Sequence, residues 1–282
     1  MQRNSKIPHS PGRLGPIVLV GMMGVGKSTV GRRLAARLGL AFVDADEEIE
    51  KAAGMSVAEI FDRYGEAYFR DGERRVIARL MDGAPKVIAT GGGAFMQEET
   101  RRLILDAAIA VWLDADIDIL VDRVGRRDSR PLLKNRDPRA VLTELAALRN
   151  PIYALAPIHV KSIAAPHEVA VDRIMEQLTA QQFLVSVSPR ITRVAPLTLL
   201  DVKQNFAMRK MLQPEIFAMA ASQVDADLIA RMNEDTSHKA PLDDDEIALK
   251  LLKANKQFNV YMAQHVKSPL LIHWIRQLAG RA

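Results

Sequence analysis

Short apolar runs alternate with longer amphipathic stretches along the first two-thirds of the chain. The apolar runs fall at residues 17–20, 41–44, 86–90, 109–113 and 157–162, and helix-like stretches separate them through about Leu178. Short apolar runs bounded by helical stretches are typical of buried strands. The pattern therefore predicts an α/β fold, with a five-stranded parallel sheet that carries helices on both faces.

The pattern changes in the last third. No helical period is evident between Gln181 and Pro196, where two prolines occur, and this predicts a linker over 181–196. From Leu197 the apolar residues recur at helical spacing, and no strand-like run appears. We expect a boundary near residue 185 and four parts: a flexible tail over 1–15, an α/β domain over 16–180, the linker, and an all-helical segment over 197–282.

The composition is that of an ordinary globular protein. Of the 282 residues, 48% are hydrophobic and 26% are charged, and no cysteine occurs, which excludes disulfides and thiolate metal sites. No run is long enough to span a membrane, and residues 1–15 do not resemble an apolar signal sequence. A cytoplasmic protein is expected. The net charge of +5 is spread along the chain, which favours small anionic substrates over nucleic acid.

Residues Gly21 to Ser28 read G-M-M-G-V-G-K-S and directly follow the first apolar run. Glycines let the backbone curl around a triphosphate, and the helix predicted from Lys27 to Leu38 adds its dipole and terminal amides. Lys27 is placed to reach the β- and γ-phosphates, and the Ser28 hydroxyl to bind Mg²⁺. A chance glycine-rich turn in this context is rare, so the sequence predicts a nucleoside triphosphate site.

Two carboxylates follow the second apolar run, in the segment Asp44-Ala45-Asp46. Alternation along a strand would turn both side chains toward the ligand crevice at the carboxyl ends of the strands. One carboxylate would help to hold Mg²⁺, and the other would orient or deprotonate an attacking hydroxyl. The alternative is a helix N-terminus, because acidic residues there complement the helix dipole. The preceding phosphate loop favours the functional interpretation.

Two further segments each allow a functional and a purely structural interpretation. Arg70 lies among aromatic residues and is followed by Glu73, so it is either a helix-surface ion pair or a clamp for a substrate carboxylate. Three glycines, Gly91 to Gly93, end the third apolar run. Such a run suits close approach of the backbone to a ligand, although a plain glycine turn also fits.

Arginines mark two later positions. The segment from Asp122 to Leu133 contains four arginines and reads as a mobile loop that closes over phosphates and excludes water, or as a solvated charge run. Arg149 stands at the predicted end of a helix, just before Pro151. Helix C-termini favour cations in any case, so this position alone does not indicate a substrate site.

Taken together, these motifs resemble the shikimate kinase family over about residues 15 to 180. The motifs that carry the resemblance are G-M-M-G-V-G-K-S-T at 21–29, D-A-D at 44–46, G-E-x-x-F-R at 65–70, G-G-G at 91–93, R-P-L-L at 130–133 and R-x-P-x-Y at 149–153. The resemblance implies a P-loop kinase fold. It also implies transfer of the γ-phosphoryl group of ATP to the 3-hydroxyl of shikimate, in the pathway to chorismate and the aromatic amino acids.

The resemblance also implies residue roles. Asp46 would bind the reacting hydroxyl and act as the base, with Lys27 and Arg130 as the other catalytic residues. The carboxylate of shikimate would be held by Arg70 and Arg149, and its ring hydroxyls by Gly91, Gly92 and Gly93. Mg²⁺ would be bound by Ser28 and Asp44. The implied ATP-binding residues are Gly24, Val25, Gly26, Lys27, Ser28, Thr29, Arg123, which would lie against the adenine, and Arg130.

The helical segment is not part of a usual shikimate kinase. Its pattern is similar to the early helices of the helical ligand-binding domain of GntR-type transcription regulators. Those domains often carry an acid and a histidine where this chain has Asn255 and Asn259, which argues against a metal site. No helix-turn-helix pattern is evident, so DNA binding is not expected. The simpler interpretation is an appended bundle for packing or self-association, in which His238, His265 and His273 are packing or surface residues.

Two other functions remain open at this point. A kinase-like domain beside a regulator-like segment could serve as a small-molecule sensor, although a binding module has no need of the full set of phosphoryl-transfer residues. A gluconate-type sugar-acid kinase shares the phosphate loop. The D-A-D, G-G-G and R-P-L-L motifs favour shikimate as the acceptor.

Overall fold

In a computed structural model, the described residues are 14–124, 137–188, 191–195, 199–236, 245–266 and 268. The chain divides into two compact units, Met1–Ala195 and Pro196–Ala282. We refer to them as the α/β unit and the helical unit and describe each by itself. No helix among the described residues combines the length and apolar character needed to cross a lipid bilayer.

The α/β unit alternates strands with helices. In chain order its elements are β1 (Ile17–Val20), α1 (Lys27–Leu38), β2 (Ala41–Asp44), α2 (Ala45–Ala53), α3 (Val57–Leu80), β3 (Lys86–Ala89), the short 3₁₀ helix η1 (Ala94–Met96), α4 (Glu98–Ala107), β4 (Ile109–Ala115), α5 (Ile117–Val124), α6 (Pro138–Tyr153), β5 (Ile158–Ser162), α7 (His167–Ala180), β6 (Leu184–Ser188) and β7 (Ile191–Val194).

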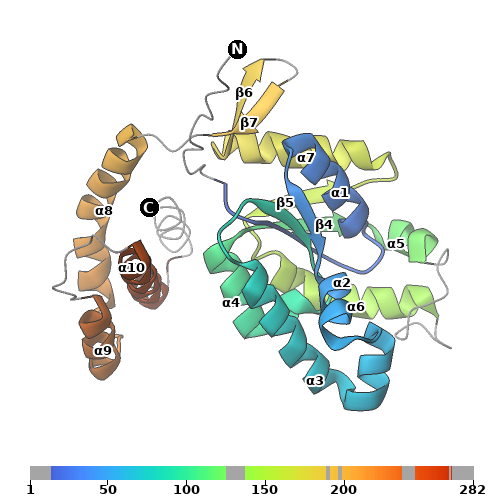
Figure 1. The fold of residues 1–282 in the computed structure, drawn as a ribbon, viewed down its shortest axis with the longest axis horizontal. Coiled ribbons are helices and arrows are strands. Elements are labelled where there is room, and N and C mark those ends of the chain that lie inside the picture. The colour runs from blue at the N-terminus through green and yellow to red at the C-terminus, as the bar shows by residue number, and fades with distance from the viewer. Residues whose placement is uncertain are drawn as a thin grey trace, which may run out of the picture. The chain divides into compact units, whose positions relative to one another are not determined.

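Strands β1 to β5 form one parallel sheet in the order β2-β3-β1-β4-β5. This confirms the predicted five-stranded sheet. Helices α1 and α7 lie on one face of it and α4 and α6 on the other (Figure 1). Strand β1 is buried along its whole length because both faces are covered, which is why it reads as a continuous apolar run.

The chain reverses direction across the sheet at β1. The connection from β2 leads to β3 beside β1, and the next connection crosses to β4 on the other side of β1. Ligand crevices in such sheets lie outside the carboxyl ends of the strands at this point. The loops after β1, β2 and β3 therefore converge on one region.

Helix starts in this unit follow sequence signals. Ser56 and Glu59 form a reciprocal capping box at the start of α3, and the Asp137 carboxylate caps α6 just before Pro138. Each cap satisfies backbone amides that the helix leaves without a partner. Helix α3 contains one irregularity, at Gly65, whose φ of 79° introduces a kink.

The segment predicted as a linker, 181–196, instead contains an antiparallel hairpin of β6 and β7. Leu184 is only 1% exposed and belongs to the core of the α/β unit, and Ala195 donates its amide to the Phe183 carbonyl at 2.9 Å. The pattern missed this element because each strand is four or five residues long. The α/β unit thus extends about fifteen residues beyond the predicted end at 180.

The helical unit consists, in the described residues, of α8 (Leu199–Ala220), α9 (Ala226–Thr236) and α10 (Asp245–His265). Its core is small and is formed by the buried residues Ile216, Ala220, Val260, Met262 and Ala263. Helix α8 also leaves large apolar side chains in solvent: Leu200, Phe206, Met211 and Met219. Large apolar side chains exposed on a helix are available for contact with a partner.

Candidate active site

The loop between β1 and α1 has the backbone of a phosphate-binding loop. Gly26 forms the N-cap of α1 in the left-handed region, with φ of 99°. A side chain there would be strained, and its Cβ would lie 3.0 Å from the ring of His167. The Lys27 ammonium donates to the carbonyls of Gly21 at 2.7 Å and Met22 at 3.0 Å, so it lies across the loop. Amides, helix dipole and ammonium together form a site for polyanions.

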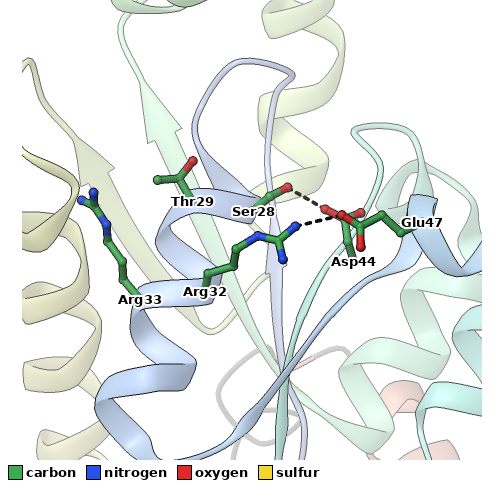
Figure 2. Close-up of a pocket in the computed structure, with 6 residues that line it drawn as sticks. All are labelled: Ser28, Thr29, Arg32, Arg33, Asp44 and Glu47. Atoms are coloured by element: carbon green, nitrogen blue, oxygen red, sulfur yellow. Dashed lines mark hydrogen bonds and ion pairs between the residues drawn. The ribbon is translucent and has the colours of Figure 1, made fainter.

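Ser28 and Asp44 meet beside this loop. The Ser28 hydroxyl donates to Asp44 Oδ2 at 2.7 Å, and Figure 2 shows the two side chains pointing toward each other. They border a cavity of about 380 Å³ whose outer wall carries the exposed Arg32–Glu47 ion pair. A hydroxyl and a carboxylate are hard oxygen ligands of the kind Mg²⁺ takes alongside phosphates. The donor set fits this ion. In the part of the chain described, no group of three or more His, Cys, Asp or Glu side chains is placed to hold a metal ion.

Asp44 and Asp46 reach the site by a different route from the one predicted. Strand β2 ends at Asp44, which caps α2 by accepting from the Asp46 amide at 3.1 Å. Asp46 therefore lies in the first turn of a helix, and helix capping rather than strand alternation sets its direction. The two alternatives, an acidic helix N-terminus and a functional pair of carboxylates, are therefore both compatible with the structure.

The Asp46 side chain is half-buried, and one of its carboxylate oxygens is fully buried. Its Oδ1 has no hydrogen-bond partner among the described residues. Burial and the neighbouring Asp44 raise the pKa of Asp46, while the Lys27 cation opposes them. A Cβ built on Gly91 would lie 2.8 Å from this oxygen and 3.0 Å from Glu73 Oε1, which also has no partner. Two acceptors therefore converge on the backbone at Gly91, an arrangement suited to binding hydroxyl groups.

Arg70 is fixed by two carboxylates. Its guanidinium pairs with Glu73 at 2.8 Å and with Glu66 at 3.0 Å, and it lies directly against Gly93. Glu73 is only 1% exposed, and burial raises its pKa although Arg70 opposes this. This is not a solvent-exposed helix pair: the cation is held against the glycine segment by a carboxylate that water does not reach.

Arg149 and Tyr153 hold Gly92 from helix α6. Arg149 Nη1 donates to the Gly92 carbonyl at 3.4 Å, and the Tyr153 hydroxyl donates to the same oxygen. Burial raises the pKa of Tyr153 to about 12, so its hydroxyl is a donor at all physiological pH values. The prediction that α6 ends before Pro151 was wrong, since the helix continues through this proline to Tyr153. The extra turn is what brings the tyrosine to the glycines.

Arg123 approaches the loop from the end of α5. Its guanidinium donates to the Val25 carbonyl at 3.0 Å and to Ser162 Oγ at 3.3 Å, and it lies near Gly26. The Val25 side chain itself is buried in the core, so this residue can offer a ligand only its backbone. The remaining predicted arginine, Arg130, lies outside the described residues together with the rest of the R-P-L-L motif.

One cavity of about 450 Å³ joins most of these groups. Its lining residues are Met23, Gly24, Gly26, Lys27, Ser28, Thr29, Asp44, Asp46, Thr90, Gly91, Gly92, Arg123 and His167. Phosphate-binding, metal-binding and acceptor-binding candidates therefore share a single space. Arg70, Arg149 and Gly93 are not among its lining residues, but the two arginines contact the glycine segment that borders it.

Sequence reasoning did not single out three residues at this site. Tyr153 was visible only as the last letter of R-x-P-x-Y. Thr90, whose buried hydroxyl donates to the Leu19 carbonyl at 3.0 Å, ties β3 to β1 just before the glycines. His167 carries no sequence signal, because its position depends on how α7 packs beside the phosphate loop.

Comparisons with known proteins place this geometry in a family. The shikimate kinase family model matches residues 23–179. The shikimate kinase of Novosphingobium aromaticivorans is 59% identical over 180 residues, which cover 62% of this chain and 93% of that protein. The shikimate kinase of Caulobacter vibrioides is 59% identical over 169 residues, or 60% of this chain and 84% of that protein.

A solved structure gives the same result. The shikimate kinase from Acinetobacter baumannii in complex with shikimate aligns with a TM-score of 0.58 and 35% identity, over 60% of this chain and 95% of that one. The family match lies within the α/β unit, and the helical unit is outside it. This chain belongs to the shikimate kinase family.

Proposed function

We propose that this protein transfers the γ-phosphoryl group of ATP to the 3-hydroxyl of shikimate, giving ADP and shikimate 3-phosphate for the synthesis of chorismate and the aromatic amino acids. The observation that carries this proposal is the shared cavity. It connects a phosphate-binding loop to a buried carboxylate whose free acceptor, Asp46 Oδ1, has no partner in the described residues.

The nucleotide end of the reaction depends on charge neutralisation. Lys27 and the loop amides bind the phosphates, and Ser28 with Asp44 would hold Mg²⁺. Mg²⁺, when bound, offsets the negative charge of the phosphates that the acceptor hydroxyl must approach. Phosphoryl transfer depends on positioning and electrostatics, so the reaction does not require a nucleophilic side chain that forms a covalent intermediate.

The acceptor end selects a hydroxylated carboxylate. Asp46 accepts a hydrogen bond from the reacting hydroxyl and takes its proton as the bond to phosphorus forms. Burial and the neighbouring Asp44 raise the pKa of Asp46, which makes it a better proton acceptor than an ordinary aspartate. Arg70 and Arg149 supply the charge for the substrate carboxylate, and Glu73 keeps Arg70 against Gly93.

Water must be kept from the γ-phosphate. We assign this role to the arginine-rich segment with Arg130, which would close over the phosphates after shikimate binds. The proposal rests on the sequence motif and the family relationship, because this segment lies outside the described residues.

The decisive experiment is a coupled ADP-release assay with shikimate, with gluconate and with no acceptor. We expect ADP formation that depends on shikimate and on Mg²⁺. Gluconate-dependent release would instead indicate a sugar-acid kinase, and ADP binding without any acceptor-dependent turnover would indicate a sensor. A Lys27→Ala variant is the control for contaminating kinases, because it removes the ammonium from the phosphate loop.

For the helical unit we propose that it mediates self-association. We also propose that it resembles the ligand-binding domain of GntR-type regulators. Asn255 and Asn259 hydrogen-bond to each other at 2.8 Å, which supports the expectation that they do not hold a metal. The exposed apolar residues of α8 are the proposed contact, and Met211 is the most exposed of them at 67%. Sedimentation of the full chain should show a dimer or larger species, which Met211→Glu weakens and the exposed polar control Glu215→Gln does not.

A further inference from the structure

The cavity has two chemically different ends. Asp46 and Gly91 lie together, where we place the acceptor, and Lys27 and Ser28 line the same cavity. Gly26, Arg123 and His167 mark the other end. A nucleotide must point its terminal phosphate toward Asp46, so the groups attached to its first phosphate, the ribose and the base, must lie toward Arg123 and His167.

His167 is placed to meet them. It is the first residue of α7, and its Cε1 and Nδ1 atoms lie 3.0 Å and 3.4 Å from the position of a Cβ built on Gly26. Arg123 Nη1 lies 3.8 Å from the same position, so the two side chains flank the loop on one side. The imidazole borders the cavity, and its Nδ1 is buried without a hydrogen-bond partner among the described residues.

A buried ring nitrogen without a partner is costly unless something else binds it. Arg123 is held in place by Val25 and Ser162, whereas no protein group in the described part of the chain holds His167 Nδ1. The ring therefore has a nitrogen available for a hydrogen bond to a molecule in the cavity. We propose that His167 hydrogen-bonds the nucleoside part of the bound nucleotide, and that it does not contact the phosphates. This rests on the proposed function, because transfer to an acceptor at Asp46 is what orients the bound nucleotide.

The ring acts through hydrogen bonding rather than charge. Burial lowers the pKa of His167, and the nearby cations Arg123 and Arg33 lower it further, while Glu168 opposes them. The imidazole is therefore neutral at physiological pH, with one nitrogen as donor and the other as acceptor. Base edges and ribose hydroxyls offer partners for both, whereas a phosphate would be better met by a cation.

The test compares two ligands by calorimetry at constant ionic strength. ADP carries base, ribose and phosphates, and inorganic tripolyphosphate carries phosphates alone. His167→Ala should weaken ADP binding about 3- to 10-fold, the loss of one hydrogen bond, and leave tripolyphosphate binding unchanged. His167→Phe keeps a ring without nitrogen and should behave like Ala. His167→Asn offers a donor and an acceptor near the position of Nδ1 and should recover part of the affinity.

His159→Ala is the matched control. This histidine lies on the neighbouring strand β5, stacks on Trp112 and does not line the cavity, so its removal should leave both dissociation constants unchanged. Unchanged ADP binding in His167→Ala and His167→Phe would overturn the proposal. Equal weakening of ADP and tripolyphosphate would overturn it too, because it would show a phosphate contact or a distorted loop. Since neither ligand reports on acceptor transfer, failure of shikimate phosphorylation would be seen separately, in the ADP-release assay.

Discussion

The buried side chain of Asn259 in the helical unit is hydrogen-bonded, whereas several buried polar atoms in the α/β unit have no partner among the described residues. Asn259 is 3% exposed, and its amide donates to the Asn255 carbonyl at 2.7 Å and to Asn255 Oδ1 at 2.8 Å. Its other amide atom contacts Gln213 across the two helices. By contrast, Asp46, Glu73 and His167 each leave one buried atom without a hydrogen bond in the described structure.

The difference separates two uses of polarity. A satisfied network such as that of Asn259 aligns helices α8 and α10 and needs no ligand. An acceptor such as Asp46 Oδ1 loses its hydration on folding and recovers a partner only when a ligand arrives. Asp46 and His167, which both border one cavity, therefore mark where the molecule sacrifices stability for binding.

The largest effect is expected from Asp46→Asn. The amide keeps the size of the side chain but cannot take the proton, so kcat should fall at least about 100-fold. ADP affinity should stay near wild type, because the phosphate loop is untouched. Steady-state kinetics and calorimetry measure the two quantities, and near wild-type turnover would refute the role of Asp46 as the base.

The same variant should be more stable than the wild type at pH 7. Because the folded-state pKa of Asp46 is raised, the fold favours the neutral form. That contribution is fully present below the ordinary pKa of 3.8 and is lost as pH rises through the folded-state value. Urea denaturation at pH 7 should therefore show a higher midpoint for Asp46→Asn. The difference between the two urea midpoints should shrink toward pH 3.5. An unchanged or lower midpoint for the variant at pH 7 would contradict this prediction.

Arg149→Ala should act mainly on shikimate binding. Loss of a charge-assisted contact costs about 1.5 to 3 kcal/mol, so kcat/KM for shikimate should fall about 10- to 150-fold through KM. The KM for ATP should change little. Arg139 is a suitable control, because it lies on the same helix and pairs with the exposed Asp118 outside the cavity. If Arg139→Ala had the same defect, the loss of shikimate binding would be due to disruption of helix α6 and not to the missing Arg149 guanidinium.

The parts of this site that the sequence could predict are those encoded locally. The phosphate loop follows β1, and Asp44 and Asp46 lie at or just after the end of β2, so a parallel sheet brings them to one edge. The contact between Tyr153 and Gly92 spans 61 positions and depends on α6 continuing through Pro151, which local rules argue against. His167 reaches Gly26 only through the packing of α7, which no local pattern encodes.

Tyr153→Phe tests this long-range contact, with a smaller expected effect on kinetics than Arg149→Ala. The variant keeps the buried ring, which stacks with Phe95 and Trp112, and removes only the hydroxyl that binds the Gly92 carbonyl. We expect the KM for shikimate to rise about 3- to 10-fold with kcat nearly unchanged. Because the pKa of Tyr153 is about 12, the defect should not vary between pH 6 and pH 9. Tyr64→Phe, at an exposed position, is the control.

The smallest effect on catalysis is expected from removing the helical unit. All the described residues with an assigned chemical role lie between Gly21 and His167, so the truncated protein 1–195 should keep kcat within about twofold of the full chain while losing self-association. A cut after Ala180 would also remove the hairpin. Exposing the pocket of Leu184 should then cost about 1.5 to 3 kcal/mol of stability without moving a catalytic group. Chemical denaturation and steady-state kinetics of both truncations separate these effects. A folded but inactive 1–195 would show that the helical unit contributes to the active site, and the contrast between the two units would no longer hold.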